Sequence, residues 1–80
     1  MKLLHVTISK VDAPVFDGDV LSVTVPGTEG EMTILADHTA LISVLKAGKI
    51  TILTDANTKE TYEVTSGTLE ISNNHATVLI

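Results

Sequence analysis

The sequence predicts an all-β domain, a flattened antiparallel sandwich or barrel of about ten short strands. Three observations lead to this prediction. Val, Ile and Thr make up 28 of the 80 residues, and β-branched side chains fit a pleated strand better than a helix. Apolar and polar residues alternate with a period of two in most segments. Turn residues separate these segments at short intervals, which is typical of two antiparallel sheets packed face to face.

The alternation identifies the strands, because successive side chains of a strand point to opposite faces of its sheet. Each strand is therefore expected to have one buried and one solvated face. In the first segment, for example, Leu4, Val6 and Ile8 alternate with His5 and Thr7. The segments with this pattern are residues 4–8, 21–25, 50–52, 62–64 and 69–71, and a further strand is expected over 76–80.

Turn signals lie between these segments, and no segment shows the periodicity of a helix. Proline cannot donate a ladder hydrogen bond, so Pro26 is expected to end the strand that Val20 begins. The last signal is expected to form a hairpin loop between the two final strands. The turn signals are Asp17-Gly18-Asp19, Pro26-Gly27, Ala47-Gly48-Lys49, Asp55-Ala56-Asn57 and Ser72-Asn73-Asn74-His75.

Length and composition indicate a single domain over residues 1–80 and exclude several classes of protein. There is no cysteine, so neither disulfides nor thiolate metal sites can support the core. A net charge of −5 leaves no basic surface for nucleic acid and favours a basic protein partner. No apolar run exceeds four residues and the start does not resemble a signal peptide, so no membrane insertion is expected.

Candidate metal sites are weak. The three histidines, His5, His38 and His75, are far apart in the sequence and lack the spacing of a zinc site. Asp17-Gly18-Asp19 resembles the start of a calcium loop, but the later oxygen ligands and the closing glutamate are missing. A simple turn is the better interpretation of these residues, and no metal or cofactor is expected.

Catalytic residues are equally hard to find. Asp37, His38 and Ser43 include the residue types of a nucleophilic triad. Neighbouring side chains of an extended chain point apart, however, and no nucleophile elbow or oxyanion nest is recognisable. The sequence therefore predicts a protein that is not an enzyme.

An acidic loop, residues 25–32, is the most distinctive feature of the chain. It contains the turn-forming residues Pro26, Gly27 and Gly30, and it carries the carboxylates of Glu29 and Glu31. A loop at the tip of a β-domain is a common place for function. Taken alone, the two glutamates are better explained as the solvated tip of a hairpin.

Several separated motifs occur in the order and spacing of one family, without a gap. They are Phe16-Asp17-Gly18, residues 25–31, His38, Leu41, residues 46–50, residues 66–71 and Thr77-Val78-Leu79. On these motifs the chain resembles the N-terminal domain of the epsilon subunit of F-type ATP synthases. It departs from the family pattern in three places: the Gly-His-Ala-Pro stretch of the family reads Asp37-His38-Thr39-Ala40 here, Ala47 replaces a proline, and Ser66 replaces the first glycine of a pair. These changes affect turns and leave the strand register intact.

The resemblance implies a flattened β-sandwich and a non-catalytic role in the rotor. In this family the domain lies at the foot of the central stalk, against the gamma subunit and the polar loops of the membrane-embedded c-ring. The chain is then a peripheral protein on the cytoplasmic face of an energy-transducing membrane. The resemblance assigns c-ring contact to Thr28, Glu29, Gly30 and Glu31, and gamma-subunit contact to Lys10, His38, Thr39 and Ser43. Phe16, Leu41, Ile50 and Leu69 are expected in the core.

Most members of the family continue into two C-terminal helices that inhibit ATP hydrolysis and in some cases bind ATP. This chain stops at the last expected strand, either as a fragment or as a naturally short member. In both cases this polypeptide is expected to have no such helical hairpin and to bind no ATP. Two alternatives stay open. The first is a free-standing acidic β-sandwich that binds another protein or a small ligand. It would need an aromatic-lined pocket, yet Phe16 and Tyr62 are the only Phe, Tyr or Trp residues in the sequence. A hydrolase would use Asp37 and His38.

Overall fold

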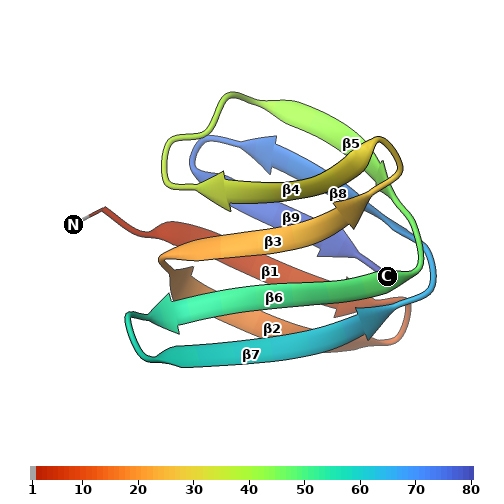
Figure 1. Ribbon diagram of the computed structural model, residues 1–80, viewed down its shortest axis with the longest axis horizontal. Helices are drawn as coiled ribbons and strands as arrows, with labels where there is room; N and C mark the ends of the chain where they lie inside the picture. The colour runs from red at the N-terminus through yellow and green to blue at the C-terminus, as the bar shows by residue number, and fades with distance from the viewer. Residues whose placement is uncertain (1) are drawn as a thin grey trace.

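The computed structural model describes residues 2–80 and contains nine β-strands (Figure 1). The all-β prediction is confirmed, with nine strands where about ten were expected. In chain order the strands are β1 (Leu4–Lys10), β2 (Ala13–Val20), β3 (Ser22–Gly27), β4 (Gly30–Leu35), β5 (Leu41–Leu45), β6 (Gly48–Asp55), β7 (Thr58–Val64), β8 (Gly67–Ser72) and β9 (His75–Leu79).

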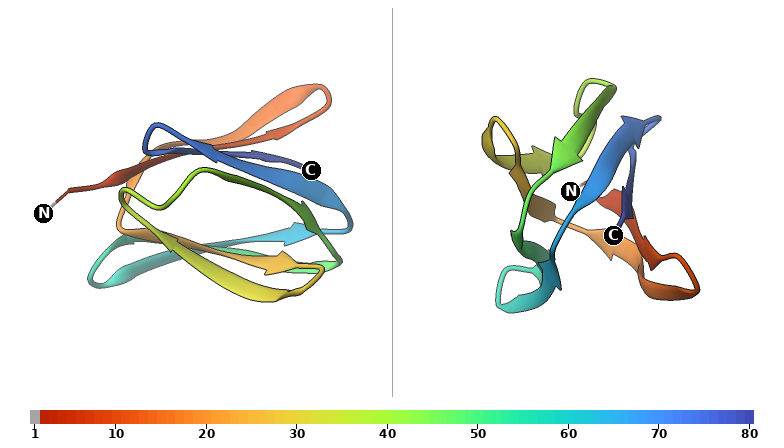
Figure 2. Two further views of the ribbon diagram at one scale, coloured as in Figure 1. Left: turned by 90° about the horizontal axis from the view of Figure 1, so that it is seen from above. Right: turned by 90° about the vertical axis from the view of Figure 1, so that its right-hand side faces the viewer.

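The strands form one continuous sheet that curls over into two layers (Figures 1 and 2). The order is β2-β1-β9-β8-β5-β3-β6-β7, and β4 pairs with the other side of β3. One layer contains β4, β3, β6 and β7, and the other contains β5, β8, β9, β1 and β2. The layers join where Gly27 of β3 pairs with Leu45 of β5.

One pair of strands departs from the antiparallel arrangement. β1 and β9 are parallel, whereas every other pair is antiparallel. These strands come from opposite ends of the chain, so no short turn fixes their relative direction. The alternation pattern gives the face of each residue but not the direction of a distant partner.

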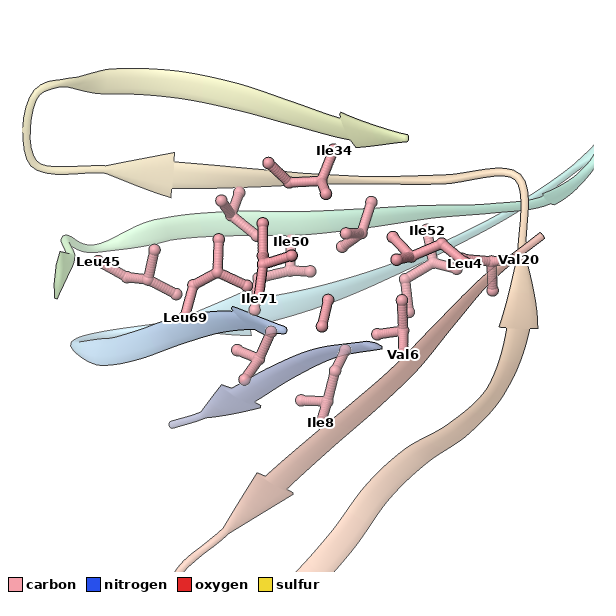
Figure 3. Packing of buried hydrophobic residues seen from close by; sticks show 14 of the residues in the cluster. Leu4, Val6, Ile8, Val20, Ile34, Leu45, Ile50, Ile52, Leu69 and Ile71 are labelled. Carbon is pink, nitrogen blue, oxygen red and sulfur yellow. The ribbon is translucent and has the colours of Figure 1, made fainter. Parts of the chain in front are cut away.

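The core lies between the two layers and is almost entirely aliphatic (Figure 3). Of the expected core residues, Ile50 and Leu69 are fully buried. Phe16 and Leu41 are only partly buried and pack against the margin of the core. The Phe16 ring lies 6.3 Å from the Tyr62 ring, measured between centroids, so the two aromatics form one small cluster at this margin.

The prediction of a turn at Asp17-Gly18-Asp19 is wrong. These residues lie inside β2, where Asp17 and Asp19 pair with Thr7 and His5 of β1. Hydroxyl and imidazole groups of β1 hydrogen-bond the two carboxylates. The aspartates therefore find their partners across the strand pair instead of capping a turn.

Pro26 does not end a strand. The chain bends at Leu21, and β3 then continues through Pro26 to Gly27. The carbonyl of Pro26 accepts a hydrogen bond from the Lys46 N–H at 2.8 Å. The N–H and C=O of a strand residue point to the same side, so the donor that proline lacks faces this side and not β4. The pairing of β3 with β4 is therefore unaffected, and Gly48 already belongs to β6 instead of a turn.

Two predicted turns are confirmed. The Asp55 carboxylate accepts a hydrogen bond from the Asn57 N–H at 2.8 Å, which closes the turn between β6 and β7. Asn73 and Asn74 form a two-residue hairpin between β8 and β9, with φ values of 51° and 60°. Positive φ at both central residues is typical of a type I′ turn, for which asparagine is well suited.

Candidate docking tip and neighbouring surfaces

The acidic loop forms the tip of the β3–β4 hairpin. Gly27 pairs with Gly30, so only Thr28 and Glu29 make the turn. Gly30 has a φ of 131°, a conformation that residues with a side chain rarely adopt. The glycine of the predicted loop is therefore needed for the shape of the tip.

The base of the tip is held by main-chain hydrogen bonds to the neighbouring chain. The Thr28 N–H donates to the Val44 carbonyl at 3.0 Å, and the Lys46 N–H donates to the Pro26 carbonyl at 2.8 Å. Both bonds connect the hairpin to β5 and the segment that follows it. The tip is thus fixed through its backbone, and its side chains take no part in that fixation.

The side chains of the tip face solvent. Thr28, Glu29 and Glu31 are exposed, and Gly30 is half-buried. Within residues 2–80, neither glutamate forms a side-chain hydrogen bond or an ion pair. The two carboxylates therefore have no partners in the described chain, and the base that carries them is held by main-chain hydrogen bonds. Such carboxylates can accept hydrogen bonds from donors of another molecule.

The residues expected to contact the gamma subunit do not form one cluster. Lys10 ends β1, near the end of the sandwich that carries the tip, whereas His38 and Thr39 lie in the β4–β5 loop at the opposite end (Figure 1). The His38 Nδ1–H donates to the Thr39 carbonyl at 2.8 Å. Ser43 lies on the same face of β5 as the buried Leu45 and is half-buried.

An exposed apolar surface, which we call the outer patch, was not predicted from the sequence. It consists of Ile42, Val44 and Leu79, whose exposed fractions are 76%, 57% and 54%. Val44 and Leu79 lie on either side of Thr68 in the pairing of β5, β8 and β9. The signal in the sequence was the run from residue 41 to 45, in which both faces of one strand are mostly apolar.

The outer patch connects the two separated groups of predicted contacts. At one end, Leu79 and Lys10 line the same shallow surface depression. At the other end, Ile42 lines a depression with Ala40, which directly follows Thr39 in the β4–β5 loop. An apolar strip thus runs between polar groups at both ends.

The residue types of a catalytic triad are not assembled. The Asp37 carboxylate lies 2.8 Å from the Lys2 ammonium, and the His38 ring bonds its own loop. In the described part of the chain, neither residue is hydrogen-bonded to Ser43, whose hydroxyl reaches only the Val44 carbonyl, at 3.5 Å.

The described histidine and carboxylate side chains also form no group of three that could hold a metal ion. No helix in residues 2–80 is long and apolar enough to cross a membrane.

Comparison with known sequences gives matches over the whole chain. The family model of the ATP synthase Delta/Epsilon chain β-sandwich domain matches residues 3–80. The ATP synthase epsilon chain of Nitratiruptor sp. is 40% identical over 80 residues, which cover 100% of this chain and 62% of the relative. That of Protochlamydia amoebophila is 38% identical over 77 residues, covering 96% of this chain and 52% of the relative.

Solved structures show the same fold. A chain of the mitochondrial ATP synthase of Euglena gracilis, in a structure of OSCP, F1 and c-ring, matches with a TM-score of 0.91 and 20% identity. The match covers 99% of this chain and 51% of the other. A chain of the central stalk and c-ring structure from Tetrahymena thermophila matches with a TM-score of 0.80 and 18% identity, covering 94% and 60%.

The sequence matches cover between 52% and 62% of the two curated relatives, so this chain corresponds to a part of each. The match to the family model is nearly complete and agrees with the all-β fold and with the motifs found in the sequence. The chain belongs to the family of ATP synthase delta/epsilon chain β-sandwich domains.

Proposed function

We propose that this chain is a non-catalytic part of the rotor of an F-type ATP synthase, where it joins the gamma subunit to the c-ring. In this role it transmits torque between ion-driven rotation of the ring and the catalytic sites. The main support is the tip, where two glutamates without internal partners stand on a base fixed by main-chain bonds. Both structural neighbours belong to structures of ATP synthases that include the c-ring.

The contact with the c-ring is proposed for Thr28, Glu29, Gly30 and Glu31. The ring presents polar loops, and basic or amide side chains on such loops can donate charge-assisted hydrogen bonds to the two carboxylates. A base held by main-chain hydrogen bonds suits a part that transmits force. Glu31 is the residue on which we expect binding to depend most.

The contact with the gamma subunit is proposed for the outer patch and its two borders. Ile42, Val44 and Leu79 supply apolar area, while Lys10 at one end and His38 with Thr39 at the other supply polar rim contacts. Ser43, which is half-buried on the opposite face of β5, is proposed as a further polar contact. Removal of the patch from water is the driving force for this contact.

Attachment to the membrane is proposed to be indirect. The chain would reach the cytoplasmic face of the energy-transducing membrane only through the ring and the gamma subunit. We also propose that it binds no ATP. Calorimetric titration of the chain with ATP is expected to show no saturable heat, and tight binding would contradict this part of the proposal.

The c-ring contact is tested by charge reversal at the tip. We expect Glu31→Lys to weaken binding to a complex of gamma subunit and c-ring about tenfold or more, because a charge-assisted hydrogen bond contributes about 1.5 to 3 kcal/mol. Glu63→Lys on β7, an exposed glutamate without a side-chain hydrogen bond within residues 2–80, is the matched control and should bind as the wild type does. High salt should also weaken wild-type binding, since charges are screened over about 8 Å at physiological ionic strength. No binding by the wild type would refute the proposed function.

The gamma contact is tested separately. Val44→Asp places a charge in the centre of the outer patch and should abolish binding to isolated gamma subunit. Thr68→Asp, at the neighbouring position on β8, should weaken this binding less. If Val44→Asp binds the gamma subunit normally while Glu31→Lys loses the ring, the outer patch is not the gamma contact.

A further inference from the structure

A network of polar side chains lies on the outer face of β2, β1 and β9, at the other end of β9 from Leu79 of the outer patch. His5 of β1 pairs with Asp19 of β2 on one side and with His75 of β9 on the other. Two residues further along β1, Thr7 pairs with Asp17 of β2. All five side chains come from outward-facing positions, so none of them serves the core.

The two ring nitrogens of His5 each face a carboxylate oxygen. Nδ1 lies 2.8 Å from an oxygen of Asp19, and Nε2 lies 2.7 Å from an oxygen of Asp17. Ionised carboxylates only accept hydrogen bonds, and a neutral imidazole has a single N–H. Both contacts are satisfied together only when His5 is an imidazolium that donates from both nitrogens.

The rest of the network has one consistent direction of donation. The Thr7 hydroxyl donates to the same Asp17 oxygen at 3.0 Å, so its oxygen is left to accept from Nε2–H of His75 at 2.9 Å. The His75 ring meets the His5 ring edge-on, with centroids 4.8 Å apart. The charged or titratable groups that face His5 are thus Asp17 and Asp19 from β2 and His75 from β9.

The electrostatics agree with this arrangement. The hydrogen bond from His5 to Asp19 is the largest effect on the pKa of His5 and raises it, with a further contribution from Asp17. The hydrogen bond from Thr7, followed by that from His5, lowers the pKa of Asp17. Both shifts favour the charged pair over the neutral one.

We propose that His5, Asp17 and Asp19 form a proton-dependent clamp that fastens the edge strand β2 to β1. β2 is the terminal strand of the sheet, and the ladder that joins it to β1 is irregular between Ile8 and Ser9. The clamp secures the regular part of this ladder. Loss of the proton from His5 turns one N–H donor into a lone pair that faces a carboxylate, and β2 is then held less firmly.

The direction of the pH effect follows from linkage. A histidine whose pKa is raised by folding contributes stability that is fully present below its unfolded value, about 6.5, and is lost as the pH rises through the folded value. The fastening of β2 should therefore weaken from neutral to mildly alkaline pH. This inference goes beyond the proposed rotor function and does not depend on it.

The protonation state is tested by NMR of the imidazole nitrogens. In the 80-residue chain at about pH 6, we expect both nitrogens of His5 to carry protons, and its titration midpoint to lie above 6.5. In Asp19→Asn and in Asp17→Asn the midpoint should fall toward 6.5. A neutral tautomer at about pH 6, or a midpoint that neither aspartate substitution lowers, would overturn the clamp.

The effect on β2 is tested by hydrogen exchange at about pH 6 and about pH 9, with rates corrected for the intrinsic pH dependence of exchange. From the lower to the higher pH, protection of the β2 amides should fall by about tenfold for each unit by which folding raises the pKa of His5. The amides of β7, the edge strand at the other end of the sheet, serve as the internal reference. In His5→Gln, the difference between the two pH values should vanish. Equal protection of β2 at both pH values in the wild type would show that the network fixes nothing.

Discussion

The loops at the two ends of the sandwich are held in different ways. At the end where the chain begins, the Asn74 amide donates to the Leu3 carbonyl at 2.8 Å and accepts from the Asp37 N–H at 2.7 Å. The Asp37 carboxylate in turn pairs with Lys2 at 2.8 Å. At the opposite end, main-chain hydrogen bonds connect the tip to β5 and to the residue after it. The Thr28 N–H donates to the Val44 carbonyl, and the Lys46 N–H donates to the Pro26 carbonyl.

This difference separates side chains that stabilise the fold from those available to a partner. Where side chains tie the loops together, a substitution should lower the free energy of unfolding. Where the backbone does so, the side chains can change with little effect on stability, and their identity reflects what they contact outside the chain. The five predictions that follow test this contrast, from the largest expected effect to the smallest.

The core is common to both ends, so damage to it should not distinguish them. Leu69 is fully buried, and Leu69→Ala is expected to lower the free energy of unfolding by about 2 to 5 kcal/mol, through lost burial and the remaining cavity. Urea denaturation measures the loss, and hydrogen exchange should show both ends opening together. Leu41→Ala, at a partly buried position, is the control and should cost less. Continued protection of one end would mean that the domain is not cooperative.

The backbone of the tip end should be sensitive even though its side chains are not. A β-carbon on Gly67 would lie 2.3 Å from the Leu79 carbonyl oxygen and 3.0 Å from the Ile80 side chain. Gly67→Ala is therefore expected to cost about 1 to 3 kcal/mol, because main chain must move to make room. The exposed neighbour provides the control, since Ser66→Ala should stay within about 0.5 kcal/mol of the wild type. A neutral Gly67→Ala would contradict the close approach of β8 and the last residues.

The opposite end should depend on one side chain. Asn74→Ala removes both hydrogen bonds that tie Leu3 and Asp37 and is expected to cost about 1 to 2 kcal/mol more than Asn73→Ala. Both asparagines have positive φ, so the matched substitution at Asn73 separates the conformational cost from the lost bonds. Thermal unfolding of the two variants makes the comparison. Equal losses would mean that the side chain of Asn74 does not hold this end.

Much of the fold follows from the sequence because it is encoded locally. The alternation of apolar and polar residues gives the strands, and Asn73 with Asn74 gives a hairpin by their preference for positive φ. Asp17 shows the limit of such reasoning. Its neighbours suggest a turn, whereas its partners Thr7 and His5 lie ten and twelve residues away and become visible only after β1 and β2 are paired.

One part of the candidate site could likewise be predicted from the sequence, and another part could not. The tip is a local feature, and the glycine at position 30 marks its shape in advance. The outer patch is not local, because a strand with apolar residues on both faces is equally typical of a fully buried strand. Whether Ile42 and Val44 are covered depends on the arrangement of whole layers, and here both side chains stay exposed on the outer face of theirs.

Acid should act on the network around His5 and not on the tip. Because folding lowers the pKa of Asp17, its contribution is present above the unfolded value, 3.8, and is lost as the pH falls through the lower folded value. We expect the thermal midpoint of Asp17→Asn to be less sensitive to acid below about pH 4 than that of the wild type. The comparison variant is Glu29→Gln/Glu31→Gln, whose carboxylates form no hydrogen bond or ion pair with another described side chain. If the two variants respond alike, Asp17 has no special part in acid stability.

The smallest effect on stability is expected at the tip itself. Both glutamates are exposed and without partners within residues 2–80, so Glu29→Gln/Glu31→Gln should leave the free energy of unfolding within about 0.5 kcal/mol of the wild type. Urea denaturation provides this measurement, and binding to the complex of gamma subunit and c-ring should be weakened in the same protein. Unchanged stability with weakened binding would assign the tip to a partner, because no role inside the chain remains for its charges. A loss of stability as large as that of Asn74→Ala would remove the distinction between the two ends.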